Sequence, residues 1–446
     1  MATALVLIQL IIVLAMIFIG ARVGSIGMGI YGMVGVFILV FIFGLPPGKI
    51  PIDVMLIIVS VITAASALQA AGGLDYMVSL AARFLRKHPD RITFYGPLTT
   101  WLFCLLAGTA HTSYSLLPII SEIATKSKIR PERPLSVATV AASLGITGSP
   151  VSAATAAIIS QDLLGAQGIE LKHILLVCIP ASLVAILVAS FVQNFVGKPL
   201  EEDPEYQRRV REGLISPDEE LSESEEEKKA RENPRAKWSV IAFLLGVLLV
   251  VIFGSFPSLR PSFGGVRLAM SDTIEIVMMS MAAVILLVGK ADVRKAVSGN
   301  VFGAGMNAMV SIFGIAWMGD TFFNGNIEFF TTHISGIVSQ YPFLFAVALF
   351  LMSIMLFSQA ATVRTLYPLG IALGISPLAL VAMFPAVNGY FFLPNYPTEV
   401  AAINFDRTGT TRVGKYVINH SFQLSGFITT FVSIGLGYLI ISFMHL

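Results

Sequence analysis

The sequence predicts an all-α polytopic membrane protein, in which two inverted repeats carry broken or re-entrant helices that form a site near the membrane midplane. Composition is the first observation: 55% of the 446 residues are hydrophobic and 13% are charged, whereas a soluble chain carries about 25% charged residues. The second is clustering, because 22 of the 56 charged residues lie between Lys198 and Lys237. The third is a pair of polar, helix-interrupting motifs in each half. Together they exclude a soluble enzyme, a nucleic-acid binder and a disordered scaffold.

The hydrophobic elements follow one another along the chain with few interruptions. A helix needs roughly 20 mostly apolar residues to span a membrane, and runs that are a turn short are expected to span with the help of tilt and flanking polar residues. An amphipathic stretch at 74–91, with Arg83, Arg86 and Lys87, predicts a helix at the membrane interface. The glycine-rich stretch at 24–35 predicts close helix packing rather than a phosphate site. The expected spans lie at 2–20, 24–45, 54–73, 92–107, 174–196, 238–254, 273–289, 299–323, 343–357 and 421–443.

The charge distribution divides the chain into a first membrane repeat (1–197), a charged linker (198–237) and a second, inverted repeat (238–446). The linker holds 13 acidic and 9 basic residues, and such a segment cannot bury enough apolar surface to order itself. Because Lys and Arg accumulate on the cytoplasmic side, we expect the linker and the basic cluster at 83–91 inside. The loop at 324–342 contains no Lys or Arg and is expected outside. Threading the spans through these points places both termini outside.

Two pairs of polar motifs relate the halves to each other. GTAHTSYSLLP at 108–118 aligns without a gap with SQAATVRTLYP at 358–368, with alanine, threonine, leucine and proline at matching positions. Further on, GSPVSAATAAI at 148–158 corresponds to LPNYPTEVAAI at 393–403. The span before the first motif begins inside and its counterpart begins outside, so the halves are expected to run in opposite directions. Inverted repeats with paired broken helices indicate a secondary transporter whose site lies near the midplane.

The chemistry of these motifs favours the binding of anions. Irregular backbone at membrane depth is tolerated where it lines a cavity, and a broken helix exposes N–H groups that attract a carboxylate. Each half is therefore expected to supply one carboxylate site, and two such sites suit a substrate with a carboxylate at each end. The candidates in the first half are Thr109, Thr112, Ser113, Ser149 and Ser152, and those in the second are Gln359, Thr362, Thr365, Asn395 and Thr398.

Three ionisable residues lie within the motifs. An arginine at the bilayer centre costs about 2.5–3.5 kcal/mol on insertion scales, so Arg364 is either a ligand of a substrate carboxylate or a structural arginine paired at a helix C-terminus. His111 is a carboxylate ligand or a proton carrier, or else a hydrogen-bonded packing residue. Glu399 is expected to take a proton or to neutralise Arg364. No metal-binding motif is present in the sequence, and no cofactor is expected.

With these residues in view, the chain resembles the anaerobic C4-dicarboxylate transporter (Dcu) family, within the ion-transporter superfamily. The resemblance implies exchange or uptake of fumarate, malate, aspartate and succinate across the bacterial inner membrane. In that membrane, the sides expected from the charge distribution make the termini periplasmic and 198–237 cytoplasmic. It also allows a homo-oligomer and a sensor-kinase partner, beside the lipid bilayer and the substrate. The strings that carry it are PIDVMLIIVSVITAASALQAAGGLD (51–75), GTAHTSYSLLPII (108–120), IRPERPLSVATVAASLGITGSPVS (129–152), RPSFGG (260–265), SQAA (358–361) and LPNYPTEVAAINFDRTGTTRVGKYVINHSF (393–422).

Other functions stay open at this point. A proton- or sodium-coupled carrier of another organic or inorganic anion would use the same architecture. An intramembrane enzyme with His111 as a base lacks a nucleophile–base pair in the sequence, so the chain is not expected to be an enzyme. A channel is disfavoured because broken repeats indicate an occluded site.

Overall fold

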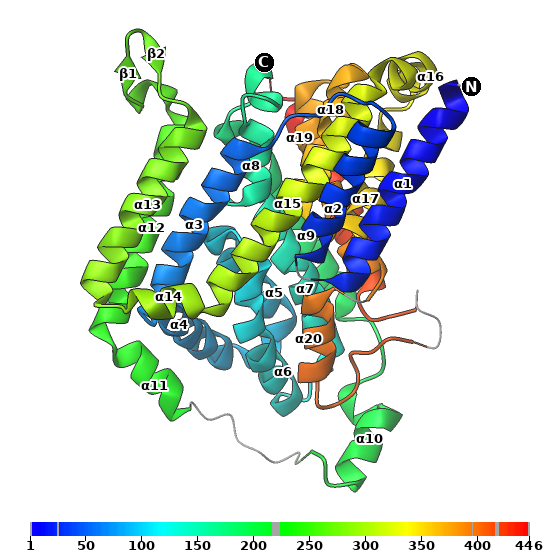
Figure 1. Cartoon of the computed structure of the whole chain (residues 1–446). Helices are drawn as coiled ribbons and strands as arrows, with labels where there is room; N and C mark the ends of the chain where they lie inside the picture. The colour runs from blue at the N-terminus through cyan, green and yellow to red at the C-terminus, as the bar shows by residue number, and fades with distance from the viewer. Residues whose placement is uncertain (1, 25, 216–223, 395, 415–418, 445–446) are drawn as a thin grey trace.

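The protein is a bundle of helices, described by a computed structural model over residues 2–24, 26–215, 224–394, 396–414 and 419–444 (Figure 1). Within these residues, seven helices are long and apolar enough to cross a membrane, which confirms the all-α membrane class. The two short strands β1 (Ser262–Phe263) and β2 (Val266–Arg267) pair as an antiparallel hairpin. The seven helices are α1 (Ala2–Val23), α3 (Ile52–Ala70), α9 (Leu171–Gln193), α12 (Pro234–Ser255), α13 (Met270–Gly289), α15 (Asn300–Gly325) and α21 (Gln423–Ile441).

The glycine-rich stretch forms α2 (Gly27–Phe37), which continues as a π-helical turn, η1 (Ile38–Ile42). A Cβ atom built on Gly32 would lie 2.5 Å from the carbonyl carbon of Gly314, and one built on Gly314 would lie 1.9 Å from the Gly29 carbonyl oxygen. The backbones of α2 and α15 therefore touch. The expectation of close helix packing is confirmed.

Two of the expected spans are instead arms of helical hairpins. α5 (Ile92–Ala107) ends at Gly108, whose φ is +68°, and the chain returns through η3 (Ala110–Ser115) into α6 (Leu117–Lys126). In the second half α17 (Phe343–Leu356) reverses at Phe357, with φ of +48°, into α18 (Gln359–Ala372). The prediction of full spans at 92–107 and 343–357 is wrong, because a left-handed residue reverses the chain before a crossing is complete. In Figure 1 the α5–α6 pair lies low and the α17–α18 pair high.

Each second motif breaks a helix, as expected. The first break separates α7 (Glu132–Thr147) from α8 (Ala153–Ile159) and contains Pro150. The second lies between η7 and α20, where Pro394 and Pro397 flank the turn. Proline removes a backbone donor and stops a helix, so these residues account for both interruptions. The helices of the second broken element are α19 (Pro377–Met383), η7 (Phe384–Phe392) and α20 (Pro397–Phe405).

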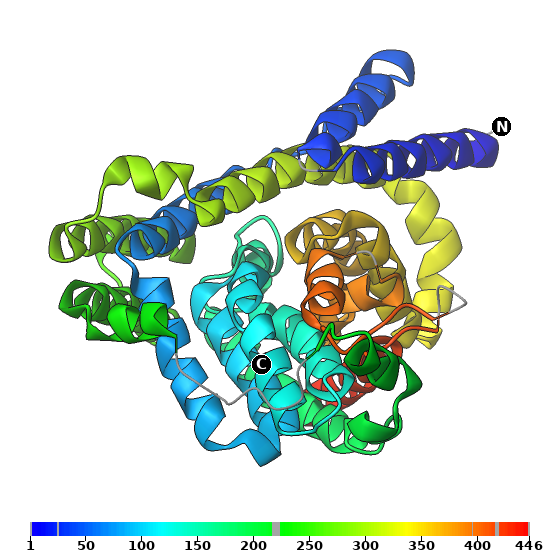
Figure 2. The ribbon, with the colours of Figure 1, turned by 90° about the horizontal axis from the view of Figure 1, so that it is seen from below.

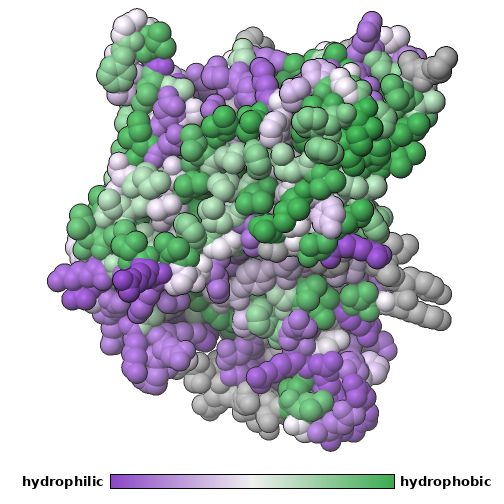
Figure 3. All heavy atoms as spheres, in the orientation of Figure 1, coloured by the Kyte–Doolittle hydropathy of each residue, from purple (hydrophilic) through white to green (hydrophobic). Residues whose placement is uncertain are grey.

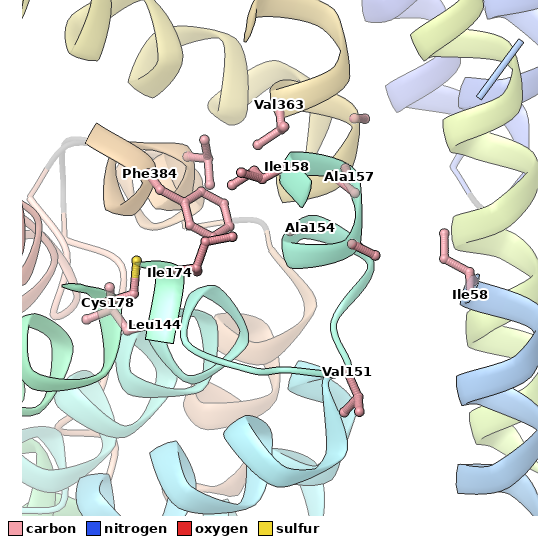
Figure 4. Packing of buried hydrophobic residues seen from close by; sticks show 14 of the residues in the cluster. Ile58, Leu144, Val151, Ala154, Ala157, Ile158, Ile174, Cys178, Val363 and Phe384 are labelled. Atoms are coloured by element: carbon pink, nitrogen blue, oxygen red, sulfur yellow. The ribbon is translucent and has the colours of Figure 1, made fainter. Parts of the chain in front are cut away.

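The helices form two bodies, which we call the frame (α1–α4 and α12–α16) and the bundle (α5–α9 and α17–α21). Seen from below, the frame lies along the top and left, with α16 at the right, and the bundle is compact between them (Figure 2). Both halves of the chain contribute to the bundle core, where Leu144, Ile174 and Phe384 converge (Figure 4). Short helices lie between the longer elements: α4 (Gly73–Lys87), η2 (Pro89–Arg91), η4 (Leu164–Gln167), η6 (Pro257–Leu259), α14 (Val293–Ser298) and α16 (Ile327–Gln340).

The linker is more ordered than its composition indicates. It contains η5 (Leu200–Glu202), α10 (Pro204–Arg211) and α11 (Glu225–Glu232). Asp203 accepts a hydrogen bond of 2.6 Å from Arg130 on the bundle, and Arg209 donates to the Arg407 carbonyl at 2.7 Å. The expectation that the linker is unordered is wrong for these parts. Polar contacts with the membrane-embedded part of the protein order them, although the linker has no hydrophobic core of its own. Residues 216–223 lie outside the described residues.

The linker and the chain ends lie at opposite faces of the molecule. Hydrophilic residues gather at the lower end, where α10 and α11 lie, and hydrophobic residues cover the region above (Figure 3). Both ends of the chain lie at the upper face, and the amphipathic helix α4 lies near the lower one (Figure 1). Since α6 returns to the lower face, the basic segment between α6 and α7 also lies beside the linker, where Arg130 contacts Asp203.

Candidate functional site

The tip of the first hairpin touches the first helix break. A Cβ atom on Gly108 would lie 2.8 Å from the carbonyl oxygen of Val151, so only glycine fits between the two segments. Thr109 caps η3, and its hydroxyl accepts a hydrogen bond from the backbone N–H of His111 at 3.3 Å. The hydroxyl of Thr112 donates to the Thr109 carbonyl at 3.2 Å. These bonds hold a tight polar turn against the end of α7.

A cavity of about 120 Å³ lies between this tip and the frame. Thr109 and His111 are the polar side chains of its wall on the bundle side, which also contains Ala107, Gly108, Val151 and Ala153, whereas the frame side is built only from small or aliphatic residues. Figure 4 shows Ile58 of α3 facing Val151 and Ala154 across this space. A small anion held by the polar wall would therefore meet a smooth apolar surface opposite. The frame residues of the lining are Ile58, Val61, Ile62, Ala65, Val301, Ala304, Gly305 and Ala308.

The other hydroxyls predicted in the first half are buried and bond to nearby backbone. Ser113 donates to the Ala110 carbonyl at 2.7 Å. Ser149 accepts from the backbone N–H of Val151 at 3.3 Å, and Ser152 caps α8 by accepting from Thr155 at 3.1 Å. Side chains of this kind stabilise turns and helix starts. They shape the tip and the break that present His111 and Thr109 to the cavity.

The tip of the second hairpin is fastened to α7. Ser358 caps α18, and Thr362 donates to the Ser358 carbonyl at 2.8 Å. The amide nitrogen of Gln359 donates to the Ser143 carbonyl at 2.8 Å and also to the side chain of Asn388. Its amide oxygen is buried without a hydrogen-bond partner in the described part of the chain. The sequence missed Asn388, since nothing in the local pattern of η7 indicates that contact.

The second break buries two predicted residues, Thr398 and Glu399, which are 2% and 3% exposed. One carboxyl oxygen of Glu399 and the hydroxyl of Tyr390 have no partner among the described residues. The Tyr390 ring stacks on Tyr396 with centroids 4.7 Å apart. A buried polar group without a partner costs about 1–3 kcal/mol, so these atoms indicate a place for a proton, a water or a ligand. Asn395 lies outside the described residues.

Arg364 lies in a different place from the cavity beside His111. Its guanidinium makes two hydrogen bonds to Asp162, of 2.9 and 2.6 Å, and one of 3.2 Å to Ser160. Neutralisation of Arg364 was one of the two roles expected for Glu399, but the structure places Asp162 there. Asp162 follows α8 and belongs to neither motif, so the sequence alone gave no reason to select it. The neighbouring Thr365 is buried and lies against Gly319 of α15.

The described residues of the site offer no evident place for a metal ion. Across the described residues, no group of three or more His, Cys, Asp or Glu side chains is arranged to hold one.

A larger cavity, of about 690 Å³, lies beside the linker between α6 and α20. Its wall includes Glu122, Lys126 and Arg407, and it lies outside the four motifs except at Pro118.

The chain is similar to known proteins over nearly its whole length. A family described as "Anaerobic c4-dicarboxylate membrane transporter" matches residues 5–445. The C4-dicarboxylate transporter DcuA of Escherichia coli (strain K12) is 42% identical over 444 residues, covering 99% of this chain and 100% of the relative. The anaerobic C4-dicarboxylate transporter DcuB of Escherichia coli O6:H1 is 39% identical, covering 97% of each chain. A crystal structure of the Alcanivorax borkumensis YdaH transporter shares the fold, with a TM-score of 0.58 and 15% identity over 86% of this chain and 84% of that one.

Proposed function

The chain belongs to the anaerobic C4-dicarboxylate membrane transporter family, and from this premise we propose that it exchanges or takes up C4-dicarboxylates across the bacterial inner membrane. Fumarate, malate, aspartate and succinate are the proposed substrates. Transport proceeds by alternating access, in which the bundle moves against the frame.

The observation that carries this proposal is the cavity of about 120 Å³ at the boundary of the two bodies. Its polar groups, Thr109 and His111, belong to the bundle, and its apolar wall belongs to the frame. A substrate bound to the bundle can travel with it, because the frame offers no polar group on that wall to hold it back. The small residues of α3 and α15 favour such a sliding contact.

Within the site we propose one carboxylate at each hairpin tip. Thr109 and His111 bind the first, and Thr112, Ser113, Ser149 and Ser152 hold the backbone that presents them. The second position is assigned to the other hairpin tip and break, with Gln359, Thr362, Asn395 and Thr398, where the N–H groups at the start of α18 attract a carboxylate. Arg364 and Thr365 act at the boundary with the frame. The opposite levels of the two hairpins (Figure 1) support an inverted repeat, with the linker cytoplasmic and both termini periplasmic.

The proposal is tested by efflux of labelled succinate from loaded proteoliposomes, with and without external fumarate. We expect strong acceleration by external fumarate and little response to an imposed sodium or proton gradient. Excess unlabelled citrate and phosphate serve as controls and should not accelerate efflux. Efflux that ignores fumarate but follows a gradient would show an ion-coupled carrier instead of an exchanger.

A proton-coupled carrier is the second candidate, and the buried Glu399 carboxyl with an unpartnered oxygen favours it. In that case Glu399 takes and releases the proton, with His111 as the other candidate. Uptake by Glu399→Gln should then lose its dependence on an imposed proton gradient while exchange continues. A gradient response equal to that of the unmodified protein would rule out Glu399 as the carrier.

A further inference from the structure

Charged residues line the boundary between frame and bundle at the upper end of the molecule. A small cavity of about 20 Å³ lies there, with Lys49 and Asp320 on the frame side and Asp162 and Arg364 on the bundle side. Asp320 accepts a hydrogen bond of 2.6 Å from the backbone N–H of Lys49. Arg364 is bound through both of its terminal nitrogens to Asp162. The two sides thus face each other closely, yet the ion pair of Arg364 with Asp162 stays within the bundle.

The lower end shows a similar arrangement with different residues, and with one contact across the boundary. Arg86 of α4, on the frame, binds Glu227 of the linker helix α11 through hydrogen bonds of 2.6 and 3.0 Å. Glu122 of α6, on the bundle, pairs with Lys126 at 2.8 Å. One contact crosses the boundary, since Arg86 lies 3.6 Å from Glu122. Each of these two residues keeps a shorter contact on its own side.

This arrangement has a direct consequence for movement. Separating a half-buried ion pair leaves two charges without partners, which is strongly unfavourable in a low-dielectric boundary. A charge whose counter-charge lies in the same body keeps that partner when the bodies part, so the separation costs little free energy. The self-contained pairs therefore allow charged residues at a moving boundary without locking it.

We propose that Asp162 and Glu227 are positioning residues for transport, an inference that rests on the proposed movement of the bundle against the frame. Asp162 keeps Arg364 neutralised within the bundle, and Glu227 keeps Arg86 neutralised on the frame side. Without its own partner, each arginine turns to the carboxylate across the boundary. That carboxylate is Asp320 at the upper end and Glu122 at the lower end. The pair with Asp320 is new, whereas the pair with Glu122 strengthens a contact of 3.6 Å that already exists, and in both cases the pair then has to break in every transport cycle.

The test is succinate–fumarate exchange by Asp162→Asn in proteoliposomes, compared with Asp320→Asn and the double variant. In Asp162→Asn the amide oxygen can still accept a hydrogen bond from Arg364, but the positive charge of Arg364 no longer has a counter-charge. We expect the maximal rate of Asp162→Asn to fall about tenfold or more, with the KM for fumarate unchanged. Asp320→Asn alone should exchange at the normal rate, and adding it to Asp162→Asn should restore most of the rate. A purely structural role of Asp162 predicts no such rescue.

The lower end provides a second test that does not depend on the stability of Asp162→Asn. Glu227→Gln should slow exchange, and Glu227→Gln combined with Glu122→Gln should recover it. A normal rate in the single variants that insert, or a slow rate that the second substitution does not restore, would overturn the inference. Absence of exchange in the unmodified protein would instead refute the proposed function.

Discussion

At the scale of single residues, His111 is the side chain whose removal should weaken substrate binding most directly. It lines the cavity beside Thr109, and a hydrogen bond to a charged group contributes about 1.5–3 kcal/mol. We therefore expect His111→Ala to raise the KM for fumarate by roughly 10- to 100-fold, with normal insertion into the membrane. The measurement is initial exchange rate against fumarate concentration.

The matched control is His88, an exposed histidine at the end of α4 that bonds the Phe84 carbonyl at 3.0 Å. His88→Ala should leave the KM unchanged. If His111→Ala kept the KM of the unmodified protein, its imidazole would not bind substrate, and the ring contact with Tyr114, at 5.9 Å between centroids, would be its main role.

The sequence was informative about individual residues only where the backbone itself is interrupted. Gly108, Thr109 and Ser152 could be selected because helices seldom contain such residues in an apolar run, and each of them shapes a tip or a break. Asp162 and Asn388 could not be selected. Their partners are far away in the sequence, 202 and 29 residues from them, and no spacing rule connects them.

At the scale of elements, the packing of α2 on α15 should be intolerant of any added side chain at Gly314. Its built Cβ atom would lie 1.9 Å from the Gly29 carbonyl oxygen, so Gly314→Val must push the helices apart. Overpacking of this kind costs typically about 1–3 kcal/mol. We expect a clear fall in the melting temperature in detergent. Gly303→Val, in the same helix, is the control, because its Cβ meets nothing within 4 Å, and an equal fall in both variants would contradict the packing argument.

Docking of the linker helix α10 should persist at neutral pH and fail only in acid. Burial would raise the pKa of Asp203, but hydrogen bonds from Arg130 and from the backbone of α10 outweigh it and lower the pKa below the usual 3.8. Hydrogen bonds from Arg208 and Arg209 likewise lower the pKa of Glu205 to about 2. A carboxyl with a lowered pKa stabilises the folded state above its unfolded pKa and loses that contribution as pH falls through the folded value.

The measurement is the mobility of a nitroxide attached at Arg211→Cys, read from pH 8 downwards. The spectrum should stay that of an ordered helix from pH 8 to about 5 and become mobile only below about 4. Adding Asp203→Asn should make the label mobile at every pH. The native thiols, Cys104 and Cys178, are fully buried and should not take up the label. A transition near neutral pH would contradict this account of the docking.

Hydrophobic length predicted the elements well except at the hairpins and at 24–45, where the apolar helix Gly27–Ile42 is shorter than the expected span. The seven long helices coincide with expected spans, because about 20 apolar residues in a row have few other stable arrangements. The runs that became α5 and α17 have 16 and 14 residues, and composition alone does not separate a short span from a hairpin arm. The left-handed turns at Gly108 and Phe357 make these runs hairpin arms. A phenylalanine gives no sequence signal for such a turn.

At the scale of the whole molecule, the division into frame and bundle could not be predicted from the order of the motifs. The two halves were expected as consecutive repeats, 1–197 and 238–446, and each of the two bodies takes helices from both. Charge content did distinguish the linker from the membrane helices. It did not predict that the linker docks onto the bundle through Arg130 and onto the frame through Arg86. These contacts depend on which faces the folded helices present, which a pattern along one chain does not specify.

Movement of the bundle against the frame should stop when the two are joined covalently. Gly319 of α15 and Thr365 of α18 are suited to this, since a Cβ atom on Gly319 would lie 3.1 Å from the Thr365 Cβ atom, close to the spacing of about 3.5–4.5 Å in a disulfide. In Gly319→Cys/Thr365→Cys the cysteine at 365 also removes the methyl group that occupies this space. Oxidation should abolish succinate–fumarate exchange, and reduction should restore it.

Each single cysteine variant, treated with the same oxidant, controls for oxidation elsewhere, and a mass measurement shows that the bridge has formed. The comparison is between the oxidised and the reduced form of one protein, so any effect of the substitutions on substrate binding cancels. Exchange that continues at full rate through a completely bridged protein would mean that α15 and α18 stay together during transport. The polar wall around His111 would then have to open by movement of the hairpin tip alone, with the rest of the bundle at rest.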